Sequence, residues 1–498
     1  MEAEQIRADA AQLASFGYRQ QLTRALGLWS NFSLGFTYLS PVVGVYTLFA
    51  FGLATAGPAF IWTIPIVVAG QFLVVLTFGE VSSQYPIAGG IYQWCKRLLG
   101  DRYAWFAGWF YIWALLVTIA AVAFGSAPYV SALFGFTLTS GNTKAIAILM
   151  IALAALINLT GVRNLARIAL FGVVAEVLGT IVFGIIFLAK EHHHGLGAIF
   201  HTAGAGSGGY AGAFLAAALF SVWIFYGFEA CGDVAEEVVN PSRRIPRAMQ
   251  LTLIVGGVTA FFITVSYVLA VPSFGDVISG KNGNPIIAVI GAALGHAGSK
   301  VALTMVVIAF VSCTLAIQAA AIRLIFSYAR DEMIFGWRPL STVSARFHMP
   351  PGAVAVAAVI PAGISLLSGQ IVARIITFAV VGIYISFQLV VLASLLARQR
   401  GWRAQGAFTL GRYGLLVNLV AFVYGVSTIV ILSDKTPASV ANPGFFDRWL
   451  VPISAAIVAA IGLVYLFVFR PKAVVRPDAR AESGSGEEPV EAPVVPAH

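Results

Sequence analysis

The sequence predicts an all-α protein that crosses a membrane many times. Two features of its composition support this: 59% of the 498 residues are hydrophobic, and only 10% carry a charge. A soluble domain of this length needs more charge on its surface, whereas apolar segments of about 20 residues match a membrane core roughly 30 Å thick. Such segments recur along the chain, with short polar loops between them.

Twelve membrane spans are expected from these apolar segments. They cover residues 28–54, 58–81, 104–129, 145–161, 165–189, 211–234, 248–271, 301–325, 353–367, 371–396, 413–432 and 450–469. The ninth span is short, and it is expected to tilt little or to be flanked by interfacial residues. Two other apolar pieces, 91–99 and 284–295, are too short to cross and are expected to form interfacial or re-entrant helices.

The two ends of the chain differ from the membrane domain at 28–470. Residues 1–27 form a polar tail, in which 8–16 is either a short amphipathic helix on the membrane surface or part of a mobile segment. Residues 471–498 are rich in Pro, Glu, Ala and Ser without an apolar period. They are therefore expected to be disordered.

Lysine and arginine are distributed unevenly between the two sides of the membrane. With the twelve spans above, 22 of the 30 lie on the side of the N-terminus and 7 on the other, while Arg323 is close to a helix end. Because cytoplasmic loops carry an excess of Lys and Arg, both termini are expected in the cytoplasm and the protein in the cell membrane. The net charge of +9 then reflects topology, and no nucleic-acid partner is expected.

The first and sixth spans are both weakened at their centres. Span 1 reads Tyr-Leu-Ser-Pro-Val-Val-Gly at 38–44, where Pro41 lacks a backbone donor and Gly44 relaxes the next turn. Span 6 carries two glycines and an acid at 227–232. The two centres are about 187 residues apart, and spans 2–5 align with spans 7–10 at similar offsets. Each half contains five spans. Because five is an odd number, the second half enters the membrane from the side opposite to the first. This predicts an inverted repeat, with repeat one at about 28–190, repeat two at about 211–397 and two extra helices at about 413–469.

Interrupted helices at matching positions of two halves indicate a substrate site near the middle of the membrane. The free N–H groups of a broken helix favour an anion, and its free C=O groups favour an ammonium or Na⁺. An amino acid has both charges and fits between two such breaks. A kink without a binding role is the alternative for either span alone. The residues expected to bind the substrate are Tyr38, Ser40, Pro41, Val42, Val43, Gly44, Phe225, Tyr226, Gly227, Phe228, Glu229 and Ala230.

Four long motifs give the chain a family resemblance. They are FGYRQQLTRALGLWSNFSLGFTYLSPVVGVYTLF, GEVSSQYPIAGGIYQWCKRLLG, FYGFEACGDVAEEVVNPSRRIPRAM and AAAIRLIFSYARDEMI. Over about residues 15–470 the chain resembles the amino acid–polyamine–organocation (APC) superfamily, and within it the permeases for amino acids, 4-aminobutyrate and choline. The resemblance implies the five-plus-five inverted-repeat fold (leucine-transporter-like) with two extra helices, and secondary active transport of amino acids or related amines. The break in span 1 departs from the family's usual Gly-Ser-Gly type, which leaves room for other amines.

Two acids are candidates for proton coupling: Glu176 in the middle of span 5 and Glu229 beside the break in span 6. An ionisable residue at membrane depth is costly and so indicates a function. The resemblance implies that span 5 contributes to the ion site of sodium-coupled relatives and holds an ionisable residue in some proton-coupled ones. A structural hydrogen-bonding role, or direct contact with the substrate, is the alternative for each acid. Na⁺ is less expected than a proton, because the small polar residues at 312–314 in span 8 have no acid nearby and suit helix packing.

Two groups of residues are candidates for gates. Phe225 and Phe228 flank the break in span 6 and are expected to close over an amine, with aromatic packing as the alternative. Glu236, Arg243 and Arg244 lie in the charged loop after span 6, which either gates the inner mouth by salt bridges or fixes the topology as a solvated cluster. Further candidates for the inner gate are Glu80, Arg330 and Asp331.

Other classes of function find less support. The run GAGSGG at 204–209 fits GxGxxG but lies in an external loop with no preceding strand, so no nucleotide cofactor is expected. The adjacent histidines at 192–194 rarely converge on one ion, so no metal site is expected, and no nucleophile–base arrangement indicates an enzyme. The alternatives that remain are a polyamine, choline or ethanolamine permease, an amino acid exchanger, an amine sensor without transport, and a channel. The lack of an attached signalling domain argues against the sensor, and the paired breaks favour alternating access over a channel.

Overall fold

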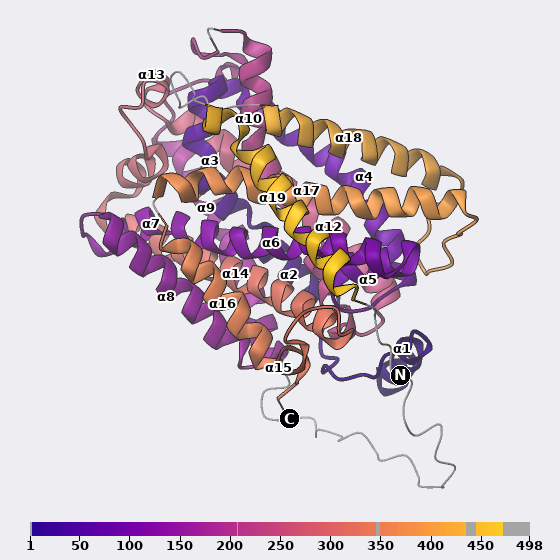
Figure 1. Cartoon of the computed structure of the whole chain (residues 1–498). Coiled ribbons are helices and arrows are strands. Elements are labelled where there is room, and N and C mark those ends of the chain that lie inside the picture. Colours follow the sequence, from indigo (N-terminus) through magenta and orange to yellow (C-terminus); the bar gives the residue numbers. More distant parts are fainter. Residues whose placement is uncertain (1, 207, 345–348, 368, 435–444, 472–498) are drawn as a thin grey trace, which may run out of the picture.

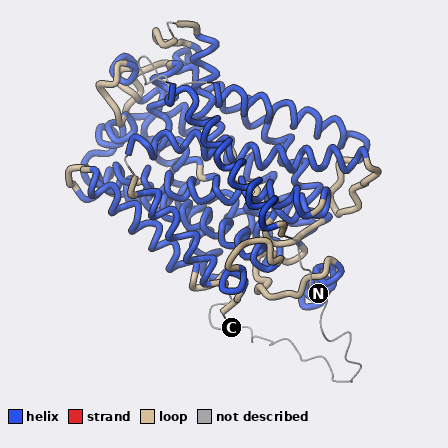
Figure 2. Tube along the Cα trace, in the orientation of Figure 1, coloured by secondary structure: helices blue, strands red, loops and turns tan. Residues whose placement is uncertain are grey.

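The computed structural model describes residues 2–206, 208–344, 349–367, 369–434 and 445–471 of the chain. Long helices pack side by side in one bundle, with α1 at one end and α13 at the other (Figure 1). Within the described residues the elements are all helices, turns and loops, and no strand is present (Figure 2). The predicted all-α class is therefore confirmed.

The helices of the first half begin with the N-terminal α1 and end with the short α11. They are α1 (Glu2–Ser15), α2 (Leu28–Leu39), α3 (Pro41–Ala56), η1 (Pro58–Trp62), α4 (Thr63–Gln84), α5 (Gly90–Leu99), α6 (Asp101–Gly125), α7 (Ala127–Phe134), α8 (Ser140–Asn158), α9 (Val162–Lys190), η2 (Leu196–Phe200), α10 (Tyr210–Ile224) and α11 (Ala230–Asp233). The helices of the second half are η3 (Ala235–Glu237), α12 (Pro241–Ala270), α13 (Phe274–Ile278), α14 (Pro285–Arg330), α15 (Trp337–Ser341), α16 (Pro351–Ser365), α17 (Gly369–Gln399), η4 (Gly411–Tyr413), α18 (Gly414–Asp434) and α19 (Phe445–Phe469).

Ten helical stretches of the described residues are long and apolar enough to cross a membrane. Two of the twelve expected spans, the sixth and the ninth, correspond instead to the shorter apolar helices α10 and α16, each of 15 residues. At 1.5 Å per residue each is about 22 Å long, which is less than a membrane core of roughly 30 Å. The count of twelve spans and the inverted repeat therefore stay predictions.

Several helices begin at a proline, and one contains a break. Pro41, Pro241 and Pro351 open α3, α12 and α16; a proline suits the first turn because its missing N–H has no partner there in any case. Inside α14, Gly295 has a φ of +61° and divides the helix in two. The piece expected as a re-entrant helix at 284–295 is the first part of α14, and the expected eighth span at 301–325 lies in the second part.

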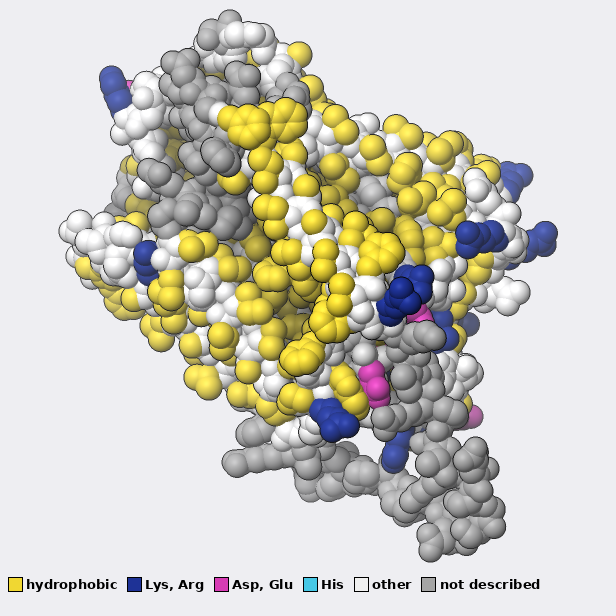
Figure 3. Space-filling view, in the orientation of Figure 1, with side chains coloured by type: hydrophobic (Ala, Val, Ile, Leu, Met, Phe, Trp, Pro, Cys, Tyr) yellow, Lys and Arg dark blue, Asp and Glu magenta, His cyan; other side chains and the backbone are white. Residues whose placement is uncertain are grey.

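The outer surface of the bundle is apolar. Exposed side chains on α8, α18 and α19 include Leu149, Val430 and Phe467. Figure 3 shows hydrophobic side chains over most of one face, with Lys and Arg at its margins. Inside the bundle, α12 packs along α4, α17 along α6, and α10 along α3. A surface of this kind matches lipid tails, which need no polar partners.

The N-terminal segment packs against the start of α12. The Asp9 carboxylate in α1 accepts a hydrogen bond from the backbone N–H of Asn240 (2.8 Å), and Arg24 donates to the carbonyl of Val238 (2.6 Å). The stretch 8–16, expected to be either a short amphipathic helix or part of a mobile segment, overlaps α1, which begins before it. The expected C-terminal tail at 471–498 lies, from residue 472 on, outside the described residues.

Candidate substrate site at the two helix breaks

A single residue interrupts the first span. Helix α2 ends at Leu39 and α3 begins at Pro41, and Ser40 between them has a φ of +36° and a ψ of 89°. This left-handed conformation is uncommon for a residue with a side chain. The Ser40 amide still donates to the carbonyl of Phe36 (2.7 Å), which closes the last turn of α2.

Five residues interrupt the sixth span. Helix α10 ends at Ile224 and α11 begins at Ala230. Within the unwound stretch 225–229, Gly227 has a φ of +113°, a conformation that glycine adopts without steric cost. Helix α11 has only four residues and is followed by the 3₁₀-helix η3.

The two breaks lie directly against each other. A Cβ atom on Gly227 would lie 2.7 Å from the backbone nitrogen of Leu39, and one on Gly44 would lie 2.5 Å from Cγ1 of Ile224. Real Cβ atoms do not approach other atoms so closely. The structure therefore brings together the two sets of residues that were predicted from the sequence to form the substrate site.

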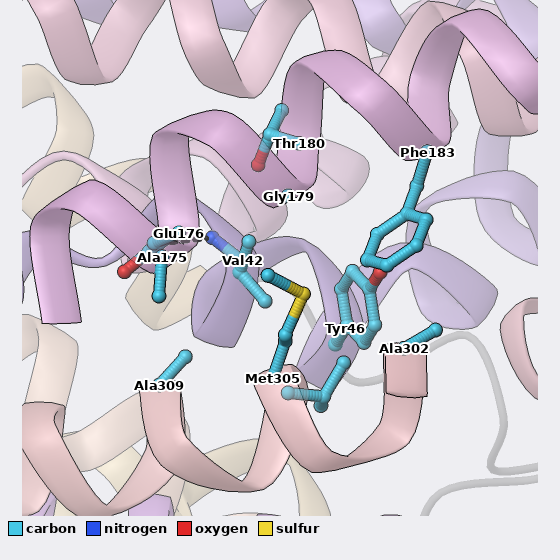
Figure 4. A pocket seen from close by; sticks show the side chains of 11 residues that line it. Val42, Tyr46, Ala175, Glu176, Gly179, Thr180, Phe183, Ala302, Met305 and Ala309 are labelled. Carbon is cyan, nitrogen blue, oxygen red and sulfur yellow. Dashed lines mark hydrogen bonds between the residues drawn. The ribbon is translucent and has the colours of Figure 1, made fainter. Parts of the chain in front are cut away.

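Glu176 reaches from α9 to the start of α3 (Figure 4). Its side chain is buried, and its Oε1 atom accepts hydrogen bonds from the Ser40 hydroxyl (2.9 Å) and from the backbone N–H of Val42 (2.8 Å). The Ser40 Oγ atom in turn accepts from the backbone N–H of Val43 (3.2 Å). A carboxylate at a helix N-terminus stabilises the helix, because it satisfies free donors and complements the helix dipole.

A small cavity lies beside Glu176, between α3, α9 and α14 (Figure 4). Its volume of about 20 Å³ leaves room for one or two water molecules. Its wall includes Tyr46 from α3 and Met305 from α14. The Thr180 hydroxyl, one turn beyond Glu176, also lines the cavity and has no hydrogen-bond partner among the described residues.

Glu229 holds the break in the sixth span. It is fully buried, and its Oε2 atom accepts from the backbone N–H of Gly227 (2.7 Å). The Tyr111 hydroxyl, from α6, lies 3.3 Å from Glu229 Oε1 and 2.8 Å from Asp233 Oδ2. Two buried carboxyl groups thus share one hydroxyl. Neither Asp233 nor Tyr111 was predicted to belong to the site.

Comparison with known proteins places this architecture in a family. The family model described as amino acid permease matches residues 26–475. The chain belongs to the amino acid permease family. It is 27% identical to an amino-acid permease, BAT1, of Arabidopsis thaliana, over 93% of this chain and 94% of the relative. It is 28% identical to the BAT1 homolog of Oryza sativa subsp. japonica, over 85% of this chain and 86% of the relative. It is also 27% identical to a choline transporter of Saccharomyces cerevisiae, over 83% of this chain and 76% of the relative.

Aromatic side chains surround the breaks of this permease. Tyr38 and Tyr226 meet edge to face with ring centroids 6.0 Å apart. Phe228 packs against Phe78 and Phe387 at 5.9 and 5.4 Å. Phe225 is buried, and its carbonyl accepts a hydrogen bond from the Gln71 amide (2.8 Å). The structure thus places both phenylalanines that were expected to form a gate in the packed interior next to the unwound stretch.

The loop after the sixth span makes ion pairs that the sequence did not indicate. Glu236 pairs with Arg330 (2.9 Å) and Glu237 with Arg323 (3.0 Å), and both acids are buried. Within the described part of the chain, neither Arg243 nor Arg244 takes part in an ion pair, so the structure does not join them to Glu236.

A second cluster joins the N-terminal segment to α5 and α14. Lys96 pairs with Asp331 (2.7 Å), and the Tyr18 hydroxyl donates to Asp331 (3.0 Å) and accepts from Lys96 (3.0 Å). Burial lowers the pKa of Lys96, but the charge of Asp331 and the contacts with Tyr18 together outweigh it, and the pKa lies above the ordinary value. Lys96 is therefore charged throughout the neutral range.

Glu80 makes its contacts elsewhere. It is buried in α4, where it accepts hydrogen bonds from the Arg398 guanidinium and from the backbone N–H of Leu410 (2.8 Å). Of the three weaker inner-gate candidates, Arg330 and Asp331 thus belong to the ionic contacts around α14, while Glu80 ties α4 to α17 and to the segment before η4.

The polar groups of 312–314 serve the helices around them. The Thr314 hydroxyl donates to the Phe310 carbonyl one turn earlier (2.8 Å), and the Cys313 thiol donates to the Tyr38 carbonyl (3.3 Å). A Cβ atom on Gly172 would lie 2.8 Å from the Ser312 hydroxyl oxygen, so α9 and α14 approach closely there. In the residues that the structure describes, no three His, Cys, Asp or Glu side chains are grouped so that they could hold a metal ion.

Proposed function

We propose that this permease is a secondary active transporter that imports amino acids or related amines by alternating access, driven by a proton gradient. The observation that carries the proposal is the direct contact between the breaks of two apolar spans, each with a buried glutamate at it: Glu176 at one and Glu229 at the other. Unwound backbone at membrane depth is tolerated where it is buried in protein or lines a water-filled cavity, and paired breaks in two repeats indicate a substrate site.

The proposal includes a topology. The chain has twelve spans, with an inverted repeat of about 28–190 and 211–397 followed by the two helices at about 413–469. Residues 1–27 and 471–498 are cytoplasmic tails, and the protein resides in the cell membrane. The excess of Lys and Arg in the loops on the side of the termini supports this orientation.

The hydrogen bonds that Glu176 accepts at the start of α3 support proton coupling. As a carboxylate, it accepts two hydrogen bonds at the start of α3, and hydrogen bonds to an ionised acceptor are stronger than those to a neutral one. Protonation of Glu176 weakens both bonds and frees α3 to move relative to α9. Glu229 belongs to the unwound stretch itself, and its protonation weakens the hydrogen bond from the Gly227 N–H.

Uptake into liposomes tests the proposal. The purified protein is expected to accumulate substrate faster when the outside is more acidic than the inside, and Glu176→Gln is expected to abolish this dependence on the gradient. Uptake that ignores the gradient but needs substrate inside the liposome would show exchange instead. Binding without any uptake would show a sensor, and single-channel currents would show a channel.

Amines of the choline type are a second candidate for the substrate. One relative is a choline transporter, and Tyr38 and Tyr226 at the breaks offer the aromatic faces that attract organic cations. A thermal-shift screen of amino acids, 4-aminobutyrate, polyamines, choline and ethanolamine, followed by uptake of the compounds that stabilise the protein, separates these candidates.

A further inference from the structure

Every backbone donor at the start of α3 already has a partner. The first four N–H groups of a helix normally lack one within the helix, and at a broken span they form the natural site for an anion. Here the Ser40 N–H donates to Phe36, Pro41 has no N–H, the Val42 N–H donates to Glu176, and the Val43 N–H donates to the Ser40 hydroxyl. A substrate carboxylate therefore finds no free donor there.

The unwound stretch before α11 also carries an acid. Glu229 lies at the end of this stretch, and its carboxyl group accepts from the Gly227 N–H (2.7 Å), while the first N–H groups of α11 donate to backbone carbonyls. Among the described residues, no Lys, Arg or His forms an ion pair with Glu176 or Glu229. Each break thus has a buried acid of the chain itself beside it, and a substrate carboxylate placed there is repelled.

The remaining polar groups at the breaks suit a cation. The Gln71 Oε1 atom is buried there without a hydrogen-bond partner, and the buried Tyr38 hydroxyl lies beside the Glu229 carboxyl group. Gln71 is fixed at the sixth span, because its amide nitrogen donates to the Phe225 carbonyl. Both oxygens can accept hydrogen bonds from a donor such as an ammonium, and the Tyr38 ring meets the Tyr226 ring edge to face.

We propose that Glu176 determines substrate specificity: it occupies the place of a substrate carboxylate, so that the permease selects organic cations without a carboxylate. This inference rests on the proposed function and narrows it from amino acids and amines to amines. Glu176 supplies the anion at the first break, and the substrate needs to bring only its positive charge.

Pairs of compounds that differ by one carboxylate test the inference. Choline is compared with glycine betaine, ethanolamine with glycine, putrescine with ornithine, and butylamine with 4-aminobutyrate. In wild-type protein the member without a carboxylate is expected to bind at least about tenfold more tightly in each pair that binds, because like charges in contact cost several kcal/mol. In Glu176→Ala the carboxylated member is expected to gain affinity and to close most of that gap.

A second measurement tests the place of the carboxylate directly. In Glu176→Ala the Ser40 hydroxyl and the Val42 N–H lose their acceptor, and a small anion can take its place. Added formate is expected to raise the melting temperature of Glu176→Ala but not that of wild type. Glu191→Gln, which removes an acid just beyond the end of α9, serves as the control and is expected to respond as wild type does. Chloride at equal concentration controls for ionic strength.

The outcomes separate the two proposals. Equal or tighter binding of the carboxylated members by wild type overturns the inference and leaves amino acid transport standing. A formate effect that is absent in a folded Glu176→Ala also overturns it. If Glu176→Ala does not fold, Glu176→Gln replaces it, because this variant keeps a hydrogen-bond acceptor but loses the charge. The affinity ratios of the compound pairs in wild type and in Glu176→Gln then decide whether the inference holds. If no member of any pair binds or is taken up, the proposed function fails, and this inference fails with it.

Discussion

Arg323 of α14 and Glu237 of η3 form a two-point ion pair inside the protein. Arg323 Nε lies 3.0 Å from Glu237 Oε2, Nη2 lies 3.0 Å from Oε1, and both side chains are buried. The pair joins the segment that follows the broken sixth span to the long helix α14. Planar, two-point contacts of this kind fix geometry as well as charge.

Removal of one partner of this pair is expected to be costly. Arg323→Met leaves the Glu237 carboxylate buried without its cation, and the expected loss in the free energy of unfolding is about 3–5 kcal/mol. The double variant Arg323→Met, Glu237→Met is expected to lose much less, since no unpaired charge remains. Thermal melts of the three proteins in detergent check this, and equal losses in the single and double variants would contradict it.

The close contact at the breaks predicts a sharp difference between two glycines near the sixth span. Gly227→Ala is expected to destabilise the protein by about 2 kcal/mol or more and to stop uptake, because the added Cβ meets the backbone of Leu39 and strains a positive φ. Gly212→Ala, in α10 with open space around it, is the matched control. It is expected to be neutral or to stabilise by up to about 1 kcal/mol. Melting temperatures and uptake rates of both variants are measured side by side, and similar behaviour of the two variants would count against the packing described.

The Lys96–Asp331 pair predicts a particular dependence on pH. Because the pKa of Lys96 is raised in the folded protein, its charge stabilises the fold fully below its ordinary pKa of about 10.4, and this contribution is lost as the pH rises through the raised value. The stability difference between wild type and Lys96→Met is therefore expected to be constant near neutral pH and to shrink only in strong alkali. Melting curves of both proteins across pH measure it. A difference that already shrinks near pH 7 would contradict the raised pKa.

Removal of the Glu80 carboxylate is expected to loosen the segment before η4. Without this carboxylate, Leu410 loses the acceptor of its N–H and Arg398 loses its partner. In Glu80→Ala, trypsin is expected to cut after Arg403 several times faster than in wild type, since cleavage follows local opening. Cleavage after Arg19, which is exposed in the loop that follows α1 and lies far along the chain from this contact, is the internal control. Mass spectrometry of the fragments gives both rates, and an unchanged ratio would argue that Glu80 does not hold this segment.

The helix breaks were predictable because their cause is local. Pro41 has no backbone N–H to donate within a helix, and Gly227 adopts a φ that other residues avoid. Both residue types can therefore be recognised in the sequence. The all-α fold followed in the same way from the apolar composition. The shortness of α10 was less visible, because Phe225, Tyr226 and Phe228 in the unwound stretch continue the hydrophobic run.

The partners of the buried acids were not predictable, because they depend on how helices face one another. Glu176 was recognised as a buried acid, but its contact with Val42 joins residues 134 positions apart. Asp233 was not singled out in the sequence, yet it is buried in the short α11, where it accepts a hydrogen bond from the Tyr111 hydroxyl. Arg323 was placed only near a helix end, and nothing in the sequence selects Glu237 over the neighbouring Glu236 as its partner.

The two broken spans differ in how far they are interrupted, by one residue at Ser40 and by five at 225–229. A break of one residue, as at Ser40, acts as a hinge. The half-helices α2 and α3 can change their angle there, but their ends stay in contact. A link of five residues has more backbone dihedrals, so α10 and α11 can change both their angle and their separation once the contacts of Gly227 with Leu39 and Glu229 are released. The two breaks look alike in the sequence, but the first is a hinge of one residue and the second is a linker of five residues.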